Sequence, residues 1–435
     1  MHAALVLCAI AAIAPSATAH AQSPSPPPAA AAASASSDED RLSVSGGGEI
    51  REAYERFGNQ NWGLSAPDRD GYWLQRVLVH AELRAGTRLR ARVDLSSSLE
   101  RGRTGGPRPL VDKDVADLHQ AFVDITLHQP AESRIAVRVG RQELAFGAGR
   151  LIAMREGTNV PSAFDGVRAT VRAGSWQVDG LAVKPASTKP DAFDDVTQRG
   201  VTVWGVYATR AGIDVYYLGL VRDAARFDQG IADETRHTLG TRVWRRAPWG
   251  YDCEVMYQFG KFGTGDVRAW RAVADASHDF ADTRWQPRAD LVLDVASGDR
   301  NPASPNLQTF NAMFQSGIYS GRAQILGPAN TIRLEPSVTL TIATGVTLST
   351  GWGVYWRQSI HDGLYGIAGN LIVPSNGVTA RYEGSRPIAQ IDWDVTRRLS
   401  LHLNYIRVFN GPFERASVHG TSTLSYLSPW LVYRF

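Results

Sequence analysis

The sequence predicts an all-β protein: a transmembrane antiparallel β-barrel of about 18 strands, with short periplasmic turns and long extracellular loops. Three observations lead to this prediction. Segments of about 10 residues alternate apolar and polar side chains along most of the chain, and this is the length that a tilted strand needs to cross a bilayer. Short turns and long polar loops alternate between these segments, whereas a soluble sandwich has no reason to sort its connections in this way. The last strand ends on an aromatic residue, Phe435.

Composition narrows the alternatives. The chain has 435 residues, of which 43% are apolar, and a formal net charge of +3. This nearly neutral balance, without a dense Lys/Arg run among aromatic residues, argues against a nucleic-acid-binding protein. After the N-terminus no segment is apolar for long enough to form a membrane-spanning helix. Because helical periodicity is almost absent, an all-β fold is the consistent interpretation.

The N-terminal region predicts export to the bacterial outer membrane. Residues 1–21 have an apolar run followed by Ala19-His20-Ala21, a small-x-small pattern typical of signal-peptide cleavage. Residues 22–40 are rich in Pro, Ala and Ser, and we expect them to form a disordered linker. The barrel is then expected over residues 41–435.

The expected strands follow in chain order. They cover residues 42–57, 72–84, 88–95, 117–128, 133–141, 167–171, 176–184, 200–209, 213–222, 235–246, 249–260, 267–280, 284–297, 332–342, 346–357, 386–395, 399–408 and 427–435. Polar, Gly- and Pro-bearing stretches at 100–115, 142–165, 184–198, 223–234, 298–331 and 358–384 are expected to be loops. Residues 142–165 either fold inward as a constriction or form a solvated surface loop.

Arginines share one face of several early strands. In residues 134–140, Ile135, Val137 and Val139 fall on one face and Arg134 and Arg138 on the other, because successive side chains of a strand point to opposite faces. Residues 88–95 and 167–172 repeat the arrangement. A barrel that turns its apolar face to lipid must turn the opposite face to the lumen.

The last strand carries a second membrane-barrel feature. Leu427, Leu431, Tyr433 and Phe435 share its outward face. A terminal phenylalanine with an aromatic residue two positions before it resembles the signal that outer-membrane barrels present to the barrel-assembly machinery. The expected surroundings of such a barrel are outer-membrane lipid and lipopolysaccharide.

Several short patches resemble the alginate export family of outer-membrane porins. One is Arg-Val-Gly-Arg-Gln-Glu-Leu at 138–144, and another is Ala-Ser-Gly-Asp-Arg at 296–300. Further patches lie at 149–151, 155–157, 164–168, 309–311, 327–330 and 428–430, so the resemblance spans nearly the whole mature chain. It implies an 18-stranded monomeric barrel whose arginine-rich lumen conducts an anionic uronate polymer.

The polar strand faces and the resemblance to the alginate export family together predict the substrate-binding residues. The predicted pore-lining residues are Arg88, Arg90, Arg92, Arg134, Arg138, Arg168 and Arg172. Guanidinium groups bind carboxylates in a bidentate manner, and low-dielectric walls concentrate anions near such charges. Some of these arginines are expected to pair with acids that also face the lumen, and this pairing would neutralise part of the positive charge. The acids are Glu82, Asp94, Asp124, Asp290 and Asp294. Further inward acids, expected to form a counter-charged side of the pore, are Asp252, Glu254, Glu335, Asp392 and Asp394.

Two other functions remain open at this level. The first is a porin for small anions without polymer specificity, which differs from a polymer exporter only in pore width and loop folding. The second, more remote, is a barrel enzyme, since residues 400–404 place Ser400, His402 and Asn404 on one strand face. We expect neither catalytic residues nor a cofactor, because no nucleophile motif, metal-ligand spacing or phosphate-binding glycine loop occurs. A passive channel has no transport direction of its own.

Overall fold

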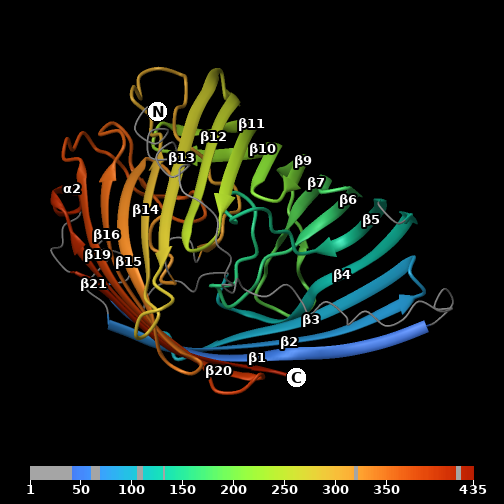
Figure 1. The fold of residues 1–435 in the computed structure, drawn as a ribbon. Coiled ribbons are helices and arrows are strands. Elements are labelled where there is room, and N and C mark those ends of the chain that lie inside the picture. Colours follow the sequence, from blue (N-terminus) through green and yellow to red (C-terminus); the bar gives the residue numbers. More distant parts are fainter. Residues whose placement is uncertain (1–41, 60–68, 105–110, 131–132, 318–321, 418–422) are drawn as a thin grey trace.

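The computed structural model describes residues 42–59, 69–104, 111–130, 133–317, 322–417 and 423–435. The expected signal peptide and linker therefore lie outside the described residues. Eighteen long antiparallel strands form one ring, in which neighbours in the chain are neighbours in space and β1 pairs with β21 to close the barrel (Figure 1). The predicted fold class is confirmed.

The ring strands are 9 to 17 residues long. They are β1 (Leu42–Gly58), β2 (Arg69–Ala85), β3 (Leu89–Arg101), β4 (Asp114–His128), β5 (Ser133–Gln142), β6 (Phe164–Ala173), β7 (Trp176–Ser187), β9 (Val201–Arg210), β10 (Ile213–Phe227), β11 (Gly230–Arg245), β12 (Trp249–Phe262), β13 (Gly265–Asp279), β14 (Arg288–Ala296), β15 (Thr331–Ala343), β16 (Val346–Arg357), β19 (Tyr382–Asp394), β20 (Leu399–Asn410) and β21 (Leu424–Arg434). Outside the ring lie β8 (Val196–Thr197), β17 (Leu364–Tyr365), β18 (Leu371–Val373) and α2 (Pro412–Ser417). No helix in these described ranges is long and apolar enough to cross a membrane.

The outer face of the wall is apolar. Val123, Val139 and Val167 are register partners on β4, β5 and β6, and all three are exposed. The next residues along the same strands are charged and form the opposite face. Strand alternation therefore places the apolar row toward lipid and the charged row toward the lumen, as the sequence pattern predicts.

The seam between β1 and β21 is closed by backbone pairing. Register partners run from Glu49 and Arg434 to Gly58 and Ser425. Phe435 extends the pairing, because its N–H donates to the Gly48 carbonyl at 3.1 Å and its carbonyl accepts from the Gly48 N–H at 3.0 Å. A sheet with all its edges paired satisfies the backbone groups that lipid cannot solvate.

One expected loop is wrong. Residues 223–234 were expected to form a long loop, but β10 runs on to Phe227 and β11 starts at Gly230, which leaves a tight hairpin. The ladder has a bulge between Arg222 and Ala225, and a bulge shifts the alternation of side chains by one residue. Beyond the bulge Ala225 and Phe227 are buried, so the strand continues with its pattern out of phase.

Long connections fold into the ring. Figure 1 shows connecting segments in the space that the strands enclose. Leu144, Leu151 and Ile152 from the β5–β6 connection pack with Phe310 and Met313 from the β14–β15 connection, in one cluster with lumen-facing wall residues. Because these segments bury apolar side chains against the inner wall, they are packed parts of the barrel interior.

Candidate functional site

The predicted cationic wall is a row of register partners. Arg84 on β2 lies opposite Arg90 on β3, Arg90 lies opposite Asp124 on β4, and Asp124 lies opposite Arg138 on β5. The row ends at Arg168 on β6, the partner of Arg138. Neighbouring strands are about 4.8 Å apart, so four arginines and one aspartate follow one another along five adjacent strands.

A second row lies four residues nearer the short turns. It contains Arg134 on β5, its register partner Arg172 on β6, and Gln177 on β7. At about 3.3 Å per residue the two rows are about 13 Å apart along the strands. Both rows therefore lie in the half of the barrel that carries the short turns, which is the periplasmic half of an outer-membrane barrel.

Both rows line one cavity of ≈ 330 Å³. Its charged lining residues are Arg84, Arg90, Asp124, Arg134, Arg138, Arg168 and Arg172. Five of the seven arginines singled out from the sequence are thus brought together, and Arg84 is a sixth that the sequence selection omitted. The signal for Arg84 was present, since it alternates with Leu83 in the same way as Arg138 with Val139.

The two remaining predicted arginines lie elsewhere. Arg88 is exposed in the turn between β2 and β3, where it belongs to neither strand, so its expected place on a strand face is wrong. Arg92 is on the lumen side of β3, but its Nε donates to Asp94 at 2.7 Å, and it does not line the cavity. Turn residues do not follow strand alternation, which is why the pattern failed at Arg88.

Carboxylates neutralise part of the cationic wall. Arg90 and Arg138 share Asp124, at 3.1 and 2.6 Å, and Arg90 also reaches Glu82 at 2.6 Å. Arg168 binds Asp179 on β7 at 2.9 Å. Asp124 and Glu82 were expected in this role from the sequence, whereas Asp179 was missed.

Two arginines keep their charge without a carboxylate partner in the described part of the chain. Arg134 donates to the Thr126 hydroxyl at 3.1 Å, and Arg172 donates to the Gln177 side-chain carbonyl at 2.9 Å. Counting Glu82 and Asp179 with the lining groups, six arginines face three carboxylates. The cavity therefore carries an excess of positive charge in a confined, partly aqueous space, and such an excess attracts anions.

The acids expected on the opposite side are mostly paired. Asp252 and Glu254 both bind Arg150, at 2.9 and 2.8 Å. Glu335 binds Arg333 at 3.2 Å, and Asp392 binds His402 at 2.6 Å. Of the five acids, Asp394 is the exposed one. The expectation of a counter-charged side is therefore wrong for Asp252, Glu254 and Glu335, because arginines of the wall and of the β5–β6 connection neutralise them, whereas Asp392 is hydrogen-bonded to an imidazole.

The β5–β6 connection crosses the lumen. Near one end Arg150 binds Asp252 and Glu254 on β12. Nine residues later the Asn159 side-chain amide donates to the carbonyls of Gln75 on β2 and Leu99 on β3, at 3.0 and 3.1 Å. In ring order β12 is nine positions from β2, half of the way around the ring. The inward constriction is therefore the correct one of the two expectations for this loop.

Contacts with β1 fix the same segment. Arg51 donates to the backbone carbonyls of Glu156 and Thr158, at 2.8 and 2.6 Å. The Asn159 side chain is fully buried, so bulk water does not compete for its hydrogen bonds. A buried, multiply bonded segment is expected to hold one position across the pore rather than to move as a surface loop.

A second inward segment is anchored at Asp362, which lies in the connection between β16 and β19. Its carboxylate accepts hydrogen bonds from the Thr309 hydroxyl at 2.5 Å, the Tyr365 hydroxyl at 2.6 Å and the Asp299 N–H at 2.8 Å. Through its bonds to Thr309 and Asp299, this carboxyl links the β14–β15 and β16–β19 connections inside the ring. Burial raises the pKa of Asp362 to about 6.

Two of the three residues considered for an enzyme, Ser400 and His402, form a hydrogen-bonded chain with Asp392, whereas the Asn404 amide donates to Gln390 at 3.1 Å. His402 Nε2 lies 3.0 Å from the Ser400 hydroxyl, and His402 Nδ1 lies 2.6 Å from Asp392. Ser400 is only 4% exposed, so substrate has little access to its hydroxyl. His402 also stacks on Trp430, with 4.6 Å between ring centroids. We interpret the three groups as a polar ladder across β19 and β20.

Comparison with known proteins identifies the family. The sequence model of the alginate export family matches residues 42–426, nearly the whole chain. The chain belongs to the alginate export family. No curated protein sequence matches it. With the barrel fold, membership of this family makes the protein an outer-membrane channel.

Solved porin structures share the fold of this alginate export family member at low sequence identity. A BenF-like porin from Pseudomonas fluorescens Pf-5 has a TM-score of 0.61 and 12% identity, over 90% of this chain and 98% of that chain. OpdO from Pseudomonas aeruginosa has a TM-score of 0.56 and 11% identity, over 90% and 97%. OccAB1 from Acinetobacter baumannii has a TM-score of 0.56 and 13% identity, over 90% and 96%. At these identities the likeness shows the architecture alone.

Proposed function

We propose that this channel passes anionic solutes and that its substrate is an anionic polysaccharide, an alginate-like polyuronate. The observation that carries the proposal is the cavity in which Arg84, Arg90, Arg134, Arg138, Arg168 and Arg172 meet. A guanidinium group presents paired N–H donors that match a carboxylate. Membership of the alginate export family favours a uronate over other anions.

The arrangement of the arginines supports a polymer. A carboxylate of a polyuronate can pass from one guanidinium to the next along the pore. A series of arginines therefore suits a polymer that carries a carboxylate on every sugar unit. Arg134 and Arg172 offer a first contact near the short turns, and Arg138 and Arg168 offer a second contact about 13 Å further along the strands. Asp124 binds Arg90 and Arg138 in the row farther from the short turns. It therefore limits how tightly these arginines bind a carboxylate of the polymer, and weak binding allows the polymer to advance.

The position of the cavity supports export. In an outer-membrane barrel the short turns face the periplasm, and the excess positive charge lies in that half. An anionic chain arriving from the periplasm would meet the arginines before the lumen-crossing segment. Capture at this mouth is expected to raise the local concentration of the polymer at the constriction.

One observation favours a second function, a porin for small anions. The β5–β6 connection spans the lumen between β12 and the β2–β3 wall, and such a segment narrows the pore. A channel that is narrow enough would select small anions with the same arginines and reject a sugar chain. The two functions share a charge preference and differ in what can pass the constriction.

A current-block experiment separates them. The purified barrel is inserted in a planar bilayer, and a defined oligouronate is added to one side while chloride current is recorded. Polyuronate transport predicts interruptions of the current that become rarer as salt rises, since screening weakens the attraction. A neutral oligosaccharide of the same length is the matched control and should leave the current unchanged.

Three results decide between the possibilities. Interruptions with oligouronate but not with the neutral sugar support the polymer channel. An anion-selective current that oligouronate never interrupts supports the small-anion porin and refutes the polymer proposal. A cation-selective current refutes both, because the excess of arginines in the cavity would then not control permeation.

A further inference from the structure

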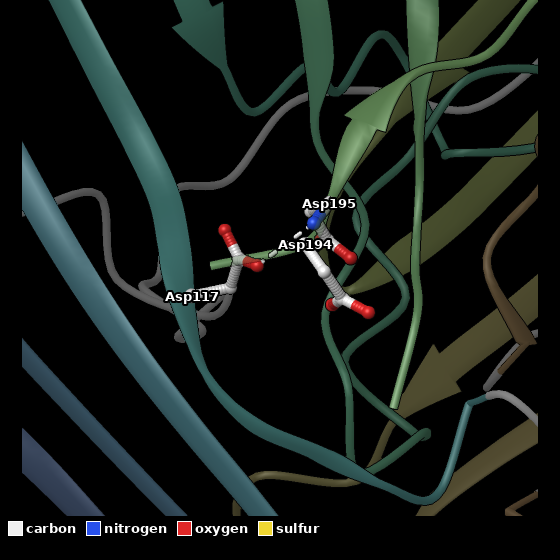
Figure 2. A group of neighbouring side chains, drawn as sticks. All are labelled: Asp117, Asp194 and Asp195. Atoms are coloured by element: carbon white, nitrogen blue, oxygen red, sulfur yellow. Dashed lines mark hydrogen bonds between the residues drawn. The ribbon is translucent and has the colours of Figure 1, made fainter. Parts of the chain in front are cut away.

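A cluster of aspartates lies at the opposite rim of the barrel, where the long connections are. One carboxylate oxygen from each of Asp117, Asp194 and Asp195 lies within 4.8 Å of the others (Figure 2). Asp117 belongs to β4, and the other two lie in the connection between β7 and β8. Carboxylates that repel one another at this distance need a counter-charge or a proton, and an acidic cluster alone does not show which.

The cluster is held by backbone contacts rather than by chance proximity of long side chains. Ala116 and Ala192 form a parallel bridge, and the Phe193 N–H donates to the Ala116 carbonyl at 2.8 Å. The Asp195 N–H donates to Asp117 Oδ2 at 2.9 Å, the bond drawn in Figure 2. The β7–β8 connection is thus fixed against the start of β4, and the carboxylates cannot easily separate.

A buried carboxylate without a hydrogen-bond partner adds the second observation. Asp114 is only 1% exposed, and its Oδ1 has no hydrogen-bond partner among the described residues. Asp114 and Asp195 line the same cavity of ≈ 10 Å³, a size that admits about one water-sized particle. A bulge in the β3–β4 ladder follows Asp114 and brings it to the same side of the strand as Asp117.

Arg141, the cation beside these four aspartates, is shared with Asp165 and neutralises them only in part. Arg141 lines the cavity, but its Nε binds Asp165 at 2.8 Å, and its Nη1 is 3.9 Å from Asp117. The Oδ1 atom of Asp194 is also buried without a hydrogen-bond partner in the described structure. Among the described residues, the four carboxylates thus share the Arg141 guanidinium, which is itself paired with Asp165, and two of them have a buried oxygen without a hydrogen-bond partner.

We propose that Asp117, Asp194 and Asp195, with Asp114 in the adjoining cavity, form a binding site for a hard divalent cation, and that this cation is Ca²⁺. Oxygen ligands from carboxylates suit Ca²⁺, whose bonds of about 2.3–2.6 Å place oxygens on opposite sides of the ion about 4.6–5.2 Å apart. The spacing of the three grouped oxygens fits within this limit. Mg²⁺ demands shorter bonds in a nearly ideal octahedron and keeps its waters, so it matches an irregular set of aspartates less well.

The bound cation has a structural consequence near the constriction. The cavity beside the cluster is also lined by Val160, Pro161 and Ala163, at the end of the lumen-crossing segment. Ca²⁺ would join β4 and the β7–β8 connection at one point beside this end of the segment. This inference does not depend on the proposed substrate, because the site is at the rim away from the arginine cavity.

Calorimetric titration with CaCl₂ tests the site. The full mature chain is refolded into detergent free of lipopolysaccharide, because lipopolysaccharide itself binds divalent cations, and folding is checked by the heat-modifiable electrophoretic band. We expect one Ca²⁺ per chain with a Kd on the order of 0.1–1 mM, the range of extracellular calcium modules. Asp194→Asn/Asp195→Asn should weaken binding by at least about tenfold, since it removes the charge of two of the three grouped carboxylates.

Asp191→Asn is the matched control, because it makes the same change in an exposed residue of the same connection, and it should bind as the wild type does. Asp195→Asn alone serves if the double variant does not fold. The proposal is overturned if folded wild-type protein binds no Ca²⁺ at 10 mM, roughly ten times the upper expected Kd. It is also overturned if the asparagine variants bind Ca²⁺ as tightly as the wild type, or if MgCl₂ binds as tightly as CaCl₂.

Discussion

Removing the two arginines without carboxylate partners, Arg134 and Arg172, should shift the channel away from anions. The change is Arg134→Gln/Arg172→Gln. Neither arginine forms an ion pair in the described structure, so glutamine removes charge without stranding an acid. Six cavity arginines against three carboxylates become four against three, so the excess falls from three charges to one.

The size of the effect follows from Coulomb's law. A charge about 7 Å from the path of an ion contributes about 0.6 kcal/mol in water, and screening at 0.1 M salt leaves roughly half of this. Loss of both charges therefore costs an anion about 0.6 kcal/mol, or roughly a 2.7-fold lower local concentration. Cations gain by the same factor, so the anion-to-cation ratio should fall roughly sevenfold at 0.1 M and only about 1.5-fold at 1 M.

The assay is the reversal potential across a planar bilayer under a salt gradient, repeated at low and high salt. Arg134→Lys/Arg172→Lys is the charge-conserving control and should keep the wild-type potential. Arg88→Gln removes an exposed arginine outside the cavity and should change the potential little. An unchanged potential at 0.1 M in the folded glutamine variant would refute the reasoning, because the unpaired charges would then not act on permeating ions.

Three further predictions follow from contacts elsewhere in the barrel. Asp124→Asn should increase anion preference in the same assay, because two arginines lose their shared counter-charge, and a shift toward cations would contradict this. Burial of Glu414 in α2 raises its pKa from 4.5 to about 8, so the folded chain holds a proton that the unfolded chain releases, and stability should fall as pH rises from about 4.5 to 8. Glu414→Gln should flatten this dependence in the heat-modification midpoint, and an equal slope in both proteins would refute it. Deleting Phe435 removes two backbone hydrogen bonds to Gly48 and should abolish the heat-modifiable band, whereas normal insertion would contradict a role in assembly.

Local sequence pattern was sufficient for the wall of the barrel. Alternation along each strand has a period of two, and it depends on the strand's own residues. It therefore predicted about 18 strands and placed Arg90, Arg134, Arg138, Arg168 and Arg172 on one face, and all five line the cavity. The prediction failed where local regularity ends: at Arg88, which lies in a turn, and at the bulge after Arg222, which changes the phase of the strand.

Contacts between distant parts of the chain could not be predicted from the sequence pattern. Strand alternation did not predict that Asp179, rather than one of the expected inward acids, would bind Arg168, or that the β5–β6 connection would reach β12 through Arg150. The aspartate cluster shows this most clearly, since Asp117 and Asp194 are far apart in sequence and have no metal-ligand spacing. Strand alternation fixes which way a side chain points from its own backbone. Only ring closure and the packing of connections inside the ring decide which distant side chains meet, because that depends on the volume that the barrel encloses and on the charges left to be paired within it.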